Sequence, residues 1–462
     1  PVAQGVSANN IQAFVCSSLR PTPLLSFAVR YLKADAGIVL TASHNPPEYN
    51  GYKVYNKYGG QIVPPEDTAI MELIQAVNYT DIKWEQKEEL IQLIDKEIDQ
   101  AYTTTIVNDS YLTAAERKET SVIFTPLHGT SIVSLPPALE QAGYRKVHII
   151  EEQKDPNGDF PTVISPNPEE SEAFTLALKQ AESIDADIIL GTDPDADRIG
   201  IGVKDLNGKW TLLNGNQLMV VLTRFVLEQQ TSMENSFIAS TVVSTPLMEK
   251  MAQAFGLECK LGLTGFKWIG KMIQDTPNKN FLCGGEESYG FLVGDKVRDK
   301  DAISAALLAC DLQSHLKGKG SSVYAYLLDT YQRFGCYQES LQSITKKGKQ
   351  GAEEIAQLMR KMRQESPKTI ANKAVVKLDD FLLGHTKHAD GSASKLDFPK
   401  ANVLKFHLSD GSTVAVRPSG TEPKIKFYIS VNGTLKKIED YPNMQAILNK
   451  TCEELMSAII SL

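Results

Sequence analysis

Three aspartates stand at alternating positions in the stretch GTDPDADRIGIG, directly after the apolar run ADIIL. Asp193, Asp195 and Asp197 can turn their carboxylates towards one point, and carboxylate oxygens are the ligands that hard divalent cations prefer. An EF-hand would need Gly at the sixth position and Glu at the twelfth, where this chain has Arg198 and Lys204. The stretch therefore indicates a metal site of another kind, with a solvated acidic turn as the alternative.

A serine occupies a similar place earlier, in TASHNPPEYNGYKVY, where Ser43 follows the apolar run GIVL and precedes His44 and two prolines. A serine held in a fixed pose at a strand end can act as a nucleophile or carry a covalent group. The sequence places no acid to complete a Ser-His-acid triad, and a Gly-x-Ser-x-Gly elbow is absent. This argues against a serine hydrolase.

Two further polar stretches follow apolar runs near the carboxyl half of the chain. RPSGTEPKIK combines Arg417, Ser419, Gly420 and Thr421. Converging N–H groups, hydroxyls and a guanidinium suit an anion such as phosphate, although a plain Pro/Gly hairpin loop fits as well. GGEESYG offers Glu286 and Ser288, which can both form hydrogen bonds with sugar hydroxyls, and a polar turn is the alternative interpretation.

Short apolar strands alternate with helical patterns around the first three stretches, which is typical of parallel α/β sheets with ligands at the carboxyl ends of strands. We expect a helix over residues 88–102, with Leu90, Ile91, Ile94 and Ile98 on one face, and another between 345 and 373. The segment IKFYISV reads as a strand of a smaller α+β domain. The expected domains are 1–102, 103–209, 210–335 and 336–462.

Composition narrows the class of protein. The 462 residues are 42% apolar and 23% charged, with a net charge of −8, as in globular proteins. No apolar run reaches 18 residues and no dense Lys/Arg block occurs, so we expect neither a membrane span nor a nucleic-acid partner. Six cysteines without a Cys-x-x-Cys pair favour a reducing compartment, the cytoplasm. The expected partners are small molecules.

Taken together and in this order, TASHNP, GTDPDADR, GGEESYG and RPSGTEP resemble the α-D-phosphohexomutase family of phosphoglucomutases and phosphomannomutases. The resemblance spans nearly the whole chain. It implies an α/β fold in which several doubly wound domains with mixed or parallel sheets surround a central cleft, with a smaller C-terminal α+β domain. Each domain would supply one loop, and the protein would act as a monomer or dimer.

The resemblance also implies roles for single residues. Ser43 matches the serine that carries the phosphoryl group, beside His44, and Asp193, Asp195 and Asp197 match the Mg²⁺ ligands, with phospho-Ser43 completing the site. Arg198 matches the arginine beside the phosphoserine, and Lys53 matches a lysine proposed for acid/base work. The remaining matches are substrate contacts: Thr264, Glu286, Ser288 and Lys300 for the sugar, and Arg417, Ser419, Gly420 and Thr421 for the phosphate that is not transferred.

The implied activity is an isomerase that interconverts glucose 1-phosphate and glucose 6-phosphate through glucose 1,6-bisphosphate. Glu287 and Tyr289 bring the third loop close to the glucose-directed form Gly-Glu-Glu-Ser-Phe-Gly, rather than to the Gly-Glu-Met-Ser-Gly of dual-specificity phosphomannomutases. Mannose or pentose phosphates remain alternative substrates. A metal-dependent sugar phosphatase and a non-catalytic sugar-phosphate sensor are the alternatives from other classes.

One departure from the family concerns the amino terminus. Members normally begin with a further α/β segment that carries Gly-Thr-x-Gly-x-Arg-Gly, whereas only the apolar run IQAFVC precedes the Ser43 strand here. We therefore expect the first domain to be truncated by roughly a hundred residues on the usual scale of domains, and to be less stable for that reason.

Overall fold

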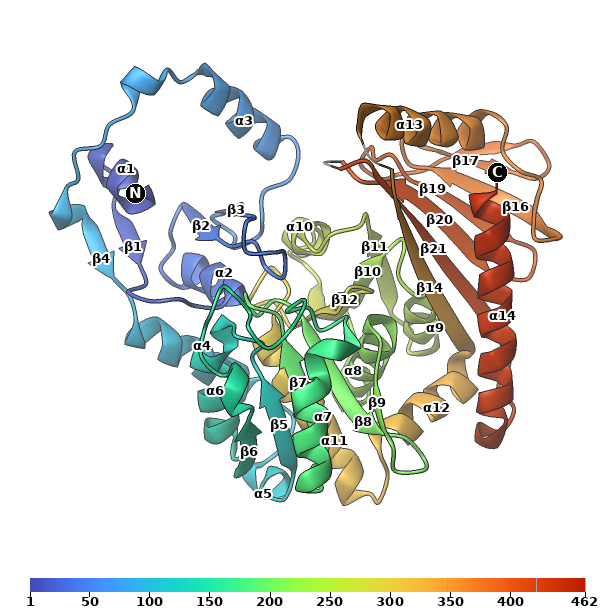
Figure 1. Ribbon diagram of the computed structural model, residues 1–462, viewed down its shortest axis with the longest axis horizontal. Helices are drawn as coiled ribbons and strands as arrows, with labels where there is room; N and C mark the ends of the chain where they lie inside the picture. Colours follow the sequence, from blue (N-terminus) through green and yellow to red (C-terminus); the bar gives the residue numbers. More distant parts are fainter. Residues whose placement is uncertain (347, 421, 462) are drawn as a thin grey trace. The chain divides into compact units, whose positions relative to one another are not determined.

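The structure is a computed structural model that describes residues 1–346, 348–420 and 422–461, and its elements are labelled in Figure 1. The chain divides into two compact units. The first comprises Pro1–Ser240 and Gly265–Ala325, and the second comprises Thr241–Thr264 and Tyr326–Leu462. Each unit is described by itself.

A five-stranded sheet in the order β6-β5-β7-β8-β9 forms the centre of the first unit. β5 runs parallel to β6 and β7, whereas β8 is antiparallel to both β7 and β9. Its strands are β5 (Ser121–Thr125), β6 (Lys146–Ile149), β7 (Ile188–Thr192), β8 (Ile199–Lys204) and β9 (Trp210–Leu212). The helices of this region include α5 (Ala114–Arg117), α6 (Leu135–Ala142), α7 (Thr175–Ser183) and α11 (Ala302–Gly318). Both central strands, β5 and β7, are buried almost throughout, which is why their sequences read as continuous apolar runs.

The amino-terminal part of the first unit contains two small pairs of strands. β1 pairs in parallel with β4, and β2 pairs antiparallel with β3. The bounds are α1 (Val2–Ala8), β1 (Ala13–Val15), α2 (Thr22–Tyr31), β2 (Ala36–Leu40), β3 (Tyr52–Asn56), α3 (Glu66–Ala76), β4 (Ile91–Leu93) and α4 (Lys96–Asn108). The expected helix over residues 88–102 is therefore wrong in its first half. Residues 91–93 form a strand because β1 offers a parallel partner, and the helix begins only at Lys96.

A third group of strands completes the first unit. β12 runs parallel to β10 and antiparallel to β13. The elements are α8 (Gly215–Gln229), β10 (Ser236–Thr241), α10 (Lys267–Asp275), β12 (Asn280–Glu286) and β13 (Gly290–Val293). Helix α8 begins with a capping box between Asn214 and Gln217 and is buried along most of its length.

An antiparallel sheet dominates the second unit, in the order β14-β21-β20-β19-β16-β17-β18, with β15 paired to β16. Its strands are β14 (Cys336–Thr345), β15 (Thr369–Ile370), β16 (Lys373–Asp380), β17 (His385–His388), β18 (Ala393–Lys395), β19 (Leu404–Leu408), β20 (Thr413–Pro418) and β21 (Lys424–Gly433). The other elements are α9 (Leu247–Ala254), β11 (Glu258–Gly262), α12 (Val323–Phe334), which starts at the end of the first unit, α13 (Gly348–Gln364) and α14 (Tyr441–Ile460). The helix expected between 345 and 373 is confirmed as α13, with Ile355, Met359 and Met362 buried, and IKFYISV lies in β21.

Two further features concern membrane-spanning helices and disulfide bonds. Within the described residues, no helix is both long and apolar enough to cross a membrane. All six cysteines are described, and each is a free thiol.

Candidate active site

The loop after β7, residues 193–197, contains the three aspartates that the sequence analysis identified, and it is called the metal loop below. Asp193, Asp195 and Asp197 are buried, and each offers an oxygen within 4.8 Å of those of the other two. Asp193 shapes the loop, since its Oδ1 accepts the backbone N–H groups of Asp197 (3.0 Å) and Arg198 (2.9 Å). Ala196 takes a positive φ of 57° where the chain turns. The backbone itself therefore holds the carboxylates at one point.

The donor set of this loop fits a hard divalent cation. Asp195 Oδ1 and Asp197 Oδ1 are buried, and neither has a hydrogen-bond partner among the described residues. Burial and the charges of the other two aspartates raise the pKa of Asp193, so a cation among the three carboxylates would relieve their mutual repulsion. A small cation that takes several carboxylate oxygens would satisfy both the unpaired atoms and the charge.

Two lysines lie against the outer oxygens of the loop. Lys53, on β3, is 3.0 Å from Asp195 Oδ2 and 3.3 Å from Asp197 Oδ2, and Lys300 is 3.1 Å from Asp197 Oδ2. Burial would lower the pKa of each lysine, but the charges of Asp197, Asp299 and the other nearby carboxylates together outweigh burial, and the pKa of both lysines is raised. Burial would likewise raise the pKa of Asp197, but Lys300 and Lys53 hold it below its usual range. Both lysines are therefore cations at neutral pH.

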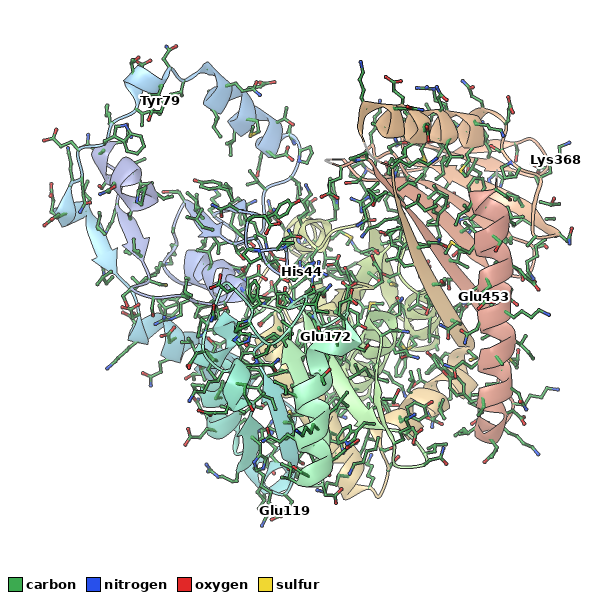
Figure 2. The ribbon with its side chains drawn as sticks, in the orientation of Figure 1. His44, Tyr79, Glu119, Glu172, Lys368 and Glu453 are labelled. Carbon is green, nitrogen blue, oxygen red and sulfur yellow. The ribbon has the colours of Figure 1, made fainter. Side chains whose placement is uncertain are left out.

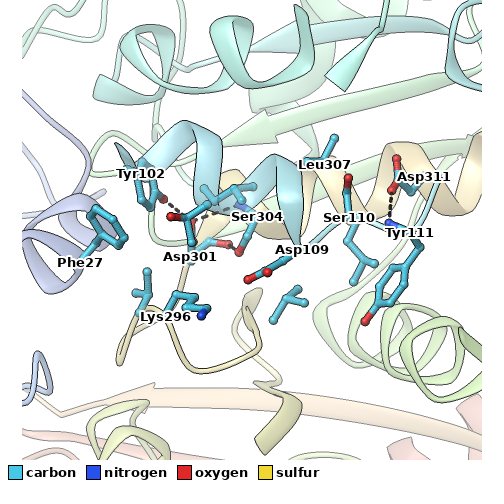
Figure 3. Close-up of a pocket in the computed structure, with 15 residues that line it drawn as sticks. Phe27, Tyr102, Asp109, Ser110, Tyr111, Lys296, Asp301, Ser304, Leu307 and Asp311 are labelled. Carbon is cyan, nitrogen blue, oxygen red and sulfur yellow. Dashed lines mark hydrogen bonds between the residues drawn. The ribbon is translucent and has the colours of Figure 1, made fainter. Parts of the chain in front are cut away.

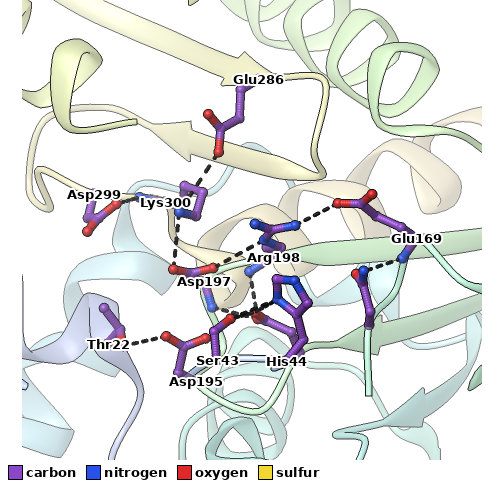
Figure 4. Close-up of polar contacts among 12 residues, drawn as sticks. Thr22, Ser43, His44, Glu169, Asp195, Asp197, Arg198, Glu286, Asp299 and Lys300 are labelled. Carbon is purple, nitrogen blue, oxygen red and sulfur yellow. Dashed lines mark hydrogen bonds and ion pairs between the residues drawn. The ribbon is translucent and has the colours of Figure 1, made fainter. Parts of the chain in front are cut away.

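Ser43 belongs to another loop, and its side chain contacts the metal loop directly (Figure 4). Its Oγ donates to Asp193 Oδ2 at 2.7 Å and lies 3.1 Å from His44 Nδ1. The serine has a positive φ of 54°, a conformation that L-residues seldom adopt, and Thr41 Oγ1 accepts its backbone N–H at 2.9 Å. Strain of this kind is found mainly at functional sites. The serine loop thus presents one hydroxyl to the aspartates, 150 residues further along the chain.

His44 sits beside the serine and is labelled in Figure 2. Burial and the nearby Arg198 guanidinium lower its pKa to about 4. The imidazole is therefore neutral at physiological pH, and it can exchange a hydrogen bond with Ser43 without adding charge to the site.

Arg198 follows the metal loop at the start of β8. Its Nη1 donates to Glu169 Oε1 at 2.6 Å, and its Nε is 3.9 Å from Asp197 Oδ1. Burial would lower the pKa of Arg198, but Asp197 and Asp193 raise it, so the guanidinium is a fixed positive charge in the same cluster as Ser43 (Figure 4).

The predicted sugar loop lies at the end of β12 and reaches the same cluster. Glu286 is buried, and its Oε1 is 3.9 Å from Lys300 Nζ. Burial raises the pKa of Glu286 to about 7, with Lys300 opposing the shift. Ser288 is half-buried in the turn between β12 and β13. Lys300 thus connects the sugar loop with the metal loop.

The remaining predicted site residues belong to the second unit, and the structure gives their local settings only. Arg417 lies near the end of β20, opposite Lys426 of β21. The Ser419 N–H donates to Lys424 O at 2.6 Å, and Gly420 is exposed. Thr421 lies outside the described residues. Thr264 ends the segment Thr241–Thr264, and its buried Oγ1 has no hydrogen-bond partner within the described chain.

Three supporting residues escaped the sequence analysis. Glu169 binds Arg198, Thr22 Oγ1 donates to Asp195 Oδ2 at 3.2 Å, and Asp299 accepts from the buried Tyr55 hydroxyl at 2.6 Å. Asp299 Oδ1 also accepts the Lys300 N–H at 2.8 Å. Only Asp299 carried a signal, because it immediately precedes a predicted site lysine.

Two cavities of the first unit border this region. One, of about 290 Å³, opens beside Ser43 and is lined by residues of the serine loop and of segments 128–130 and 156–160. The other lies around Asp301, next to Lys300 in the chain. There Asp301 accepts from the Tyr102 hydroxyl at 2.8 Å, and Phe27, Leu307 and Lys296 form part of the wall (Figure 3).

The fold and site together define a class: an α/β enzyme with a buried carboxylate centre that faces a serine hydroxyl and a ring of fixed cations. Comparison with known proteins agrees along the whole chain. Four domain descriptions of phosphoglucomutase/phosphomannomutase match in order: alpha/beta/alpha domain I at residues 1–81, domain II at 100–208, domain III at 214–333 and the C-terminal domain at 346–446.

Individual relatives point the same way. A phosphoglucomutase of Staphylococcus epidermidis is 36% identical over 439 residues, which cover 93% of this chain and 80% of that protein. A phosphoglucomutase/phosphomannomutase family protein of Burkholderia thailandensis has a similar structure, with a TM-score of 0.70 at 18% identity over 99% of this chain and 84% of the other.

The N-acetylphosphoglucosamine mutase of Aspergillus fumigatus is a more distant structural neighbour. Its complex with GlcNAc-6P and magnesium gives a TM-score of 0.51 at 13% identity (94% and 92% coverage). Its complex with glucose 1,6-bisphosphate gives 0.54 at 14% (99% and 93%).

The chain belongs to the phosphoglucomutase/phosphomannomutase family. It is accordingly an isomerase of the phosphohexomutase type, and the resemblance drawn from the four sequence stretches is confirmed.

Proposed function

We propose that the protein is a phosphoglucomutase in which Ser43 carries the transferred phosphoryl group. The observation that carries this proposal is the 2.7 Å hydrogen bond from Ser43 Oγ to Asp193, inside the only three-carboxylate cluster found in the described part of the chain. A serine phosphate at this position would place its oxygens beside the metal loop and Arg198. The S. epidermidis relative supports glucose as the sugar.

Magnesium is the proposed metal, held by Asp193, Asp195 and Asp197. The unpaired Oδ1 atoms of Asp195 and Asp197 support an oxygen-seeking cation, and the A. fumigatus mutase binds magnesium in its own complex. When bound, Mg²⁺ supplies positive charge against the oxygens of the group being transferred. Lys53 and Lys300 fix the outer carboxylate oxygens, which orients the inner ones.

In the proposed transfer, each bond that breaks is matched by one that forms, and no proton is gained or lost. The bond from phosphorus to Ser43 Oγ breaks while a bond forms to the hydroxyl oxygen at C6 of glucose 1-phosphate. Lys53, our candidate carrier, is a cation: it gives one proton to Ser43 Oγ as the bond to phosphorus breaks and takes up the proton that the C6 hydroxyl releases, so that the serine ends as a neutral hydroxyl and the lysine is again a cation. Glucose 1,6-bisphosphate then reverses its orientation, and its other phosphoryl group returns to Ser43. Because the transition state is loose, orientation and charge do most of the work.

The other predicted contacts have the chemistry that this cycle requires. We propose that Glu286, Ser288 and Thr264 bond the sugar hydroxyls, that Lys300 connects them with the metal loop, and that the loop with Arg417, Ser419, Gly420 and Thr421 binds the phosphate that stays in place. Donors that bind phosphate without reading the sugar can accept either end of the bisphosphate. The free thiols of the chain suit a reducing compartment, and we propose the cytoplasm.

Phosphorus NMR tests the proposal directly. The protein is mixed with glucose 1-phosphate, Mg²⁺ and a trace of glucose 1,6-bisphosphate, and Ser43→Ala is the matched control. We expect glucose 6-phosphate with wild type and none with the variant. Free phosphate in place of glucose 6-phosphate would instead identify a sugar phosphatase. Faster turnover of mannose or ribose phosphates would reassign the substrate within the family.

A further inference from the structure

A carboxylate outside the four recognised stretches holds the active-site arginine. Glu169 Oε1 accepts from Arg198 Nη1 at 2.6 Å, across 29 residues of sequence. The side chains are 30% and 18% exposed, respectively. At this degree of burial, a short charge-assisted hydrogen bond restricts the guanidinium more than a surface ion pair would.

A rigid turn presents this glutamate. Pro166, Asn167 and Pro168 are buried, the Asn167 side chain accepts the Glu169 N–H at 3.1 Å, and the Glu170 N–H donates to Asn167 O at 2.9 Å. A Cβ at Gly200 of β8 would come within 3.0 Å of Pro168 O. The turn therefore packs closely on β8, which begins directly after Arg198, and the position of Glu169 is fixed relative to that strand.

The opposite edge of the guanidinium has no such partner. Arg198 Nε is buried and makes no hydrogen bond to any described residue, and Asp197 Oδ1 lies 3.9 Å from it. Figure 4 shows Arg198 between Glu169 and Asp197, with Ser43 and His44 nearby. Two acids thus compete for one arginine, and only the bond to Glu169 has hydrogen-bond length.

We propose that Glu169 is a positioning residue for phosphoryl transfer. By binding Nη1, it stops Arg198 from turning onto Asp197 and leaves the Nε edge available to oxygens of the phosphoryl group on Ser43. This inference rests on the proposed phosphoserine function. A guanidinium aligned in advance donates to those oxygens without reorganising during transfer, so loss of Glu169 should slow transfer and leave sugar binding intact.

Glu169→Gln tests this inference, with Glu170→Gln as its control because Glu170 is the next residue of the same turn, whereas Arg198 binds Glu169. We expect kcat to fall by about 10- to 100-fold in Glu169→Gln, as for a misplaced catalytic group. The KM for glucose 1-phosphate should change by no more than about threefold, because uniform binding is retained. Thermal midpoints of the two variants should agree. Glu169→Asp, which keeps the charge on a shorter arm, should recover part of the loss.

A direct readout is the rate at which glucose 1,6-bisphosphate phosphorylates Ser43, followed by intact mass. We expect Glu169→Gln to slow this step as much as it slows kcat. In an Arg198→Lys background, Glu169→Gln should change the rate less than about twofold, because its target is gone. An undiminished effect there, or kcat equal to that of Glu170→Gln, overturns the positioning role while the mutase stands. Absence of phospho-Ser43 in wild type overturns both proposals.

Discussion

Two buried clusters, one in each unit, differ in whether their carboxylate oxygens are paired: the first holds three aspartates, and the second holds one aspartate with a threonine and a histidine. In the first unit, Asp195 and Asp197 each keep one buried oxygen without a partner in the described chain. In the second unit, both oxygens of Asp379 are paired: Oδ1 accepts from Thr386 at 2.6 Å, and Oδ2 is 2.7 Å from His407 Nε2. Both clusters also contain nearby lysines.

This difference separates a structural polar cluster from one arranged for a ligand. Asp379, Thr386 and His407 lie on adjacent strands of one sheet, where cross-strand pairs complete each other. The three aspartates of the metal loop repel one another, and the chain leaves part of that repulsion uncompensated. Buried polar groups left unsatisfied cost stability, so the first cluster should be the less stable one until a cation binds.

The largest expected effect comes from Asp193→Asn, which should lower the activity strongly without lowering the stability of the metal-free protein. We expect the loss of one ligand charge and of the bond that aligns Ser43 to lower kcat by about 10³-fold or more, as for groups essential to a reacting centre. In metal-free buffer the variant should be at least as stable as wild type, because Asn can still accept the two loop N–H groups and one like charge is removed.

Urea unfolding with and without Mg²⁺ would measure this. Wild type should gain roughly 2.7 kcal/mol at a metal concentration about 100 times its dissociation constant, and Asp193→Asn should gain much less. Equal gains in the two proteins would show that the metal binds elsewhere.

Asp379→Asn should behave in the opposite way and cost about 2 kcal/mol of stability. Burial would raise the pKa of Asp379, but the hydrogen bonds from His407 and Thr386 lower it to about 2. A lowered pKa stabilises the fold above the unfolded value near 3.8 and loses that effect as pH falls towards 2. The cost should therefore be constant between pH 7 and 8, where His407, whose pKa burial lowers, is neutral in the fold, and it should not depend on Mg²⁺.

The control for this variant is Asp397→Asn, because Asp397 is 93% exposed and its one ion pair within the described residues is with the exposed Lys395. Its effect in urea unfolding should stay within about 0.5 kcal/mol. If Asp379→Asn were as stable as this control, the paired cluster would have no structural role.

Glu286 allows an intermediate test, because burial raises its pKa to about 7. If the ionised carboxylate is the form that accepts hydrogen bonds from sugar hydroxyls, the KM should rise as pH falls through 7. The increase should approach tenfold between pH 8 and pH 6, when about 90% of the group is protonated. The substrate phosphate titrates in the same range, so Glu286→Gln is the necessary comparison: its KM should be higher and should follow only the substrate. Parallel profiles in both proteins would exclude Glu286 as the titrating group.

The metal loop was predictable from sequence because its chemistry is local. Asp193, Asp195 and Asp197 lie within five residues after one buried strand, and the backbone of the same loop holds them together. The same holds for the regular elements with a strong pattern, such as α13. The helix prediction was wrong for residues 91–93 because a short apolar run can form either a helix or a strand. Here its strand partner, β1, lies 78 residues away in the sequence. The role of Glu169 was missed for the same physical reason, since nothing near Glu169 in the sequence indicates its contact with Arg198.

Thr22 also contacts the three-aspartate loop from far away in the sequence, and it gives the smallest expected effect. It lies at the start of α2, fully buried, and binds Asp195 twice: its N–H donates to the backbone carbonyl at 2.9 Å and its Oγ1 donates to Oδ2 at 3.2 Å, 173 residues away. Thr22→Val keeps the shape and the backbone bond and removes only the hydroxyl. Lys53 still binds the same oxygen, so we expect a loss of about 1 kcal/mol in urea unfolding.

The exposed Thr68 of α3, whose hydroxyl bonds its neighbour Asp67 and no other side chain among the described residues, provides the control. Thr68→Val should change stability by less than about 0.5 kcal/mol. Because Thr22 orients a ligand oxygen without touching a reacting atom, Thr22→Val should also weaken Mg²⁺ binding several-fold, by analogy with other residues that orient metal ligands. If calorimetry gave the same Mg²⁺ affinity in Thr22→Val and Thr68→Val, the hydroxyl would serve the packing of α2 alone. The aspartates would then owe their alignment to their own loop and the two lysines.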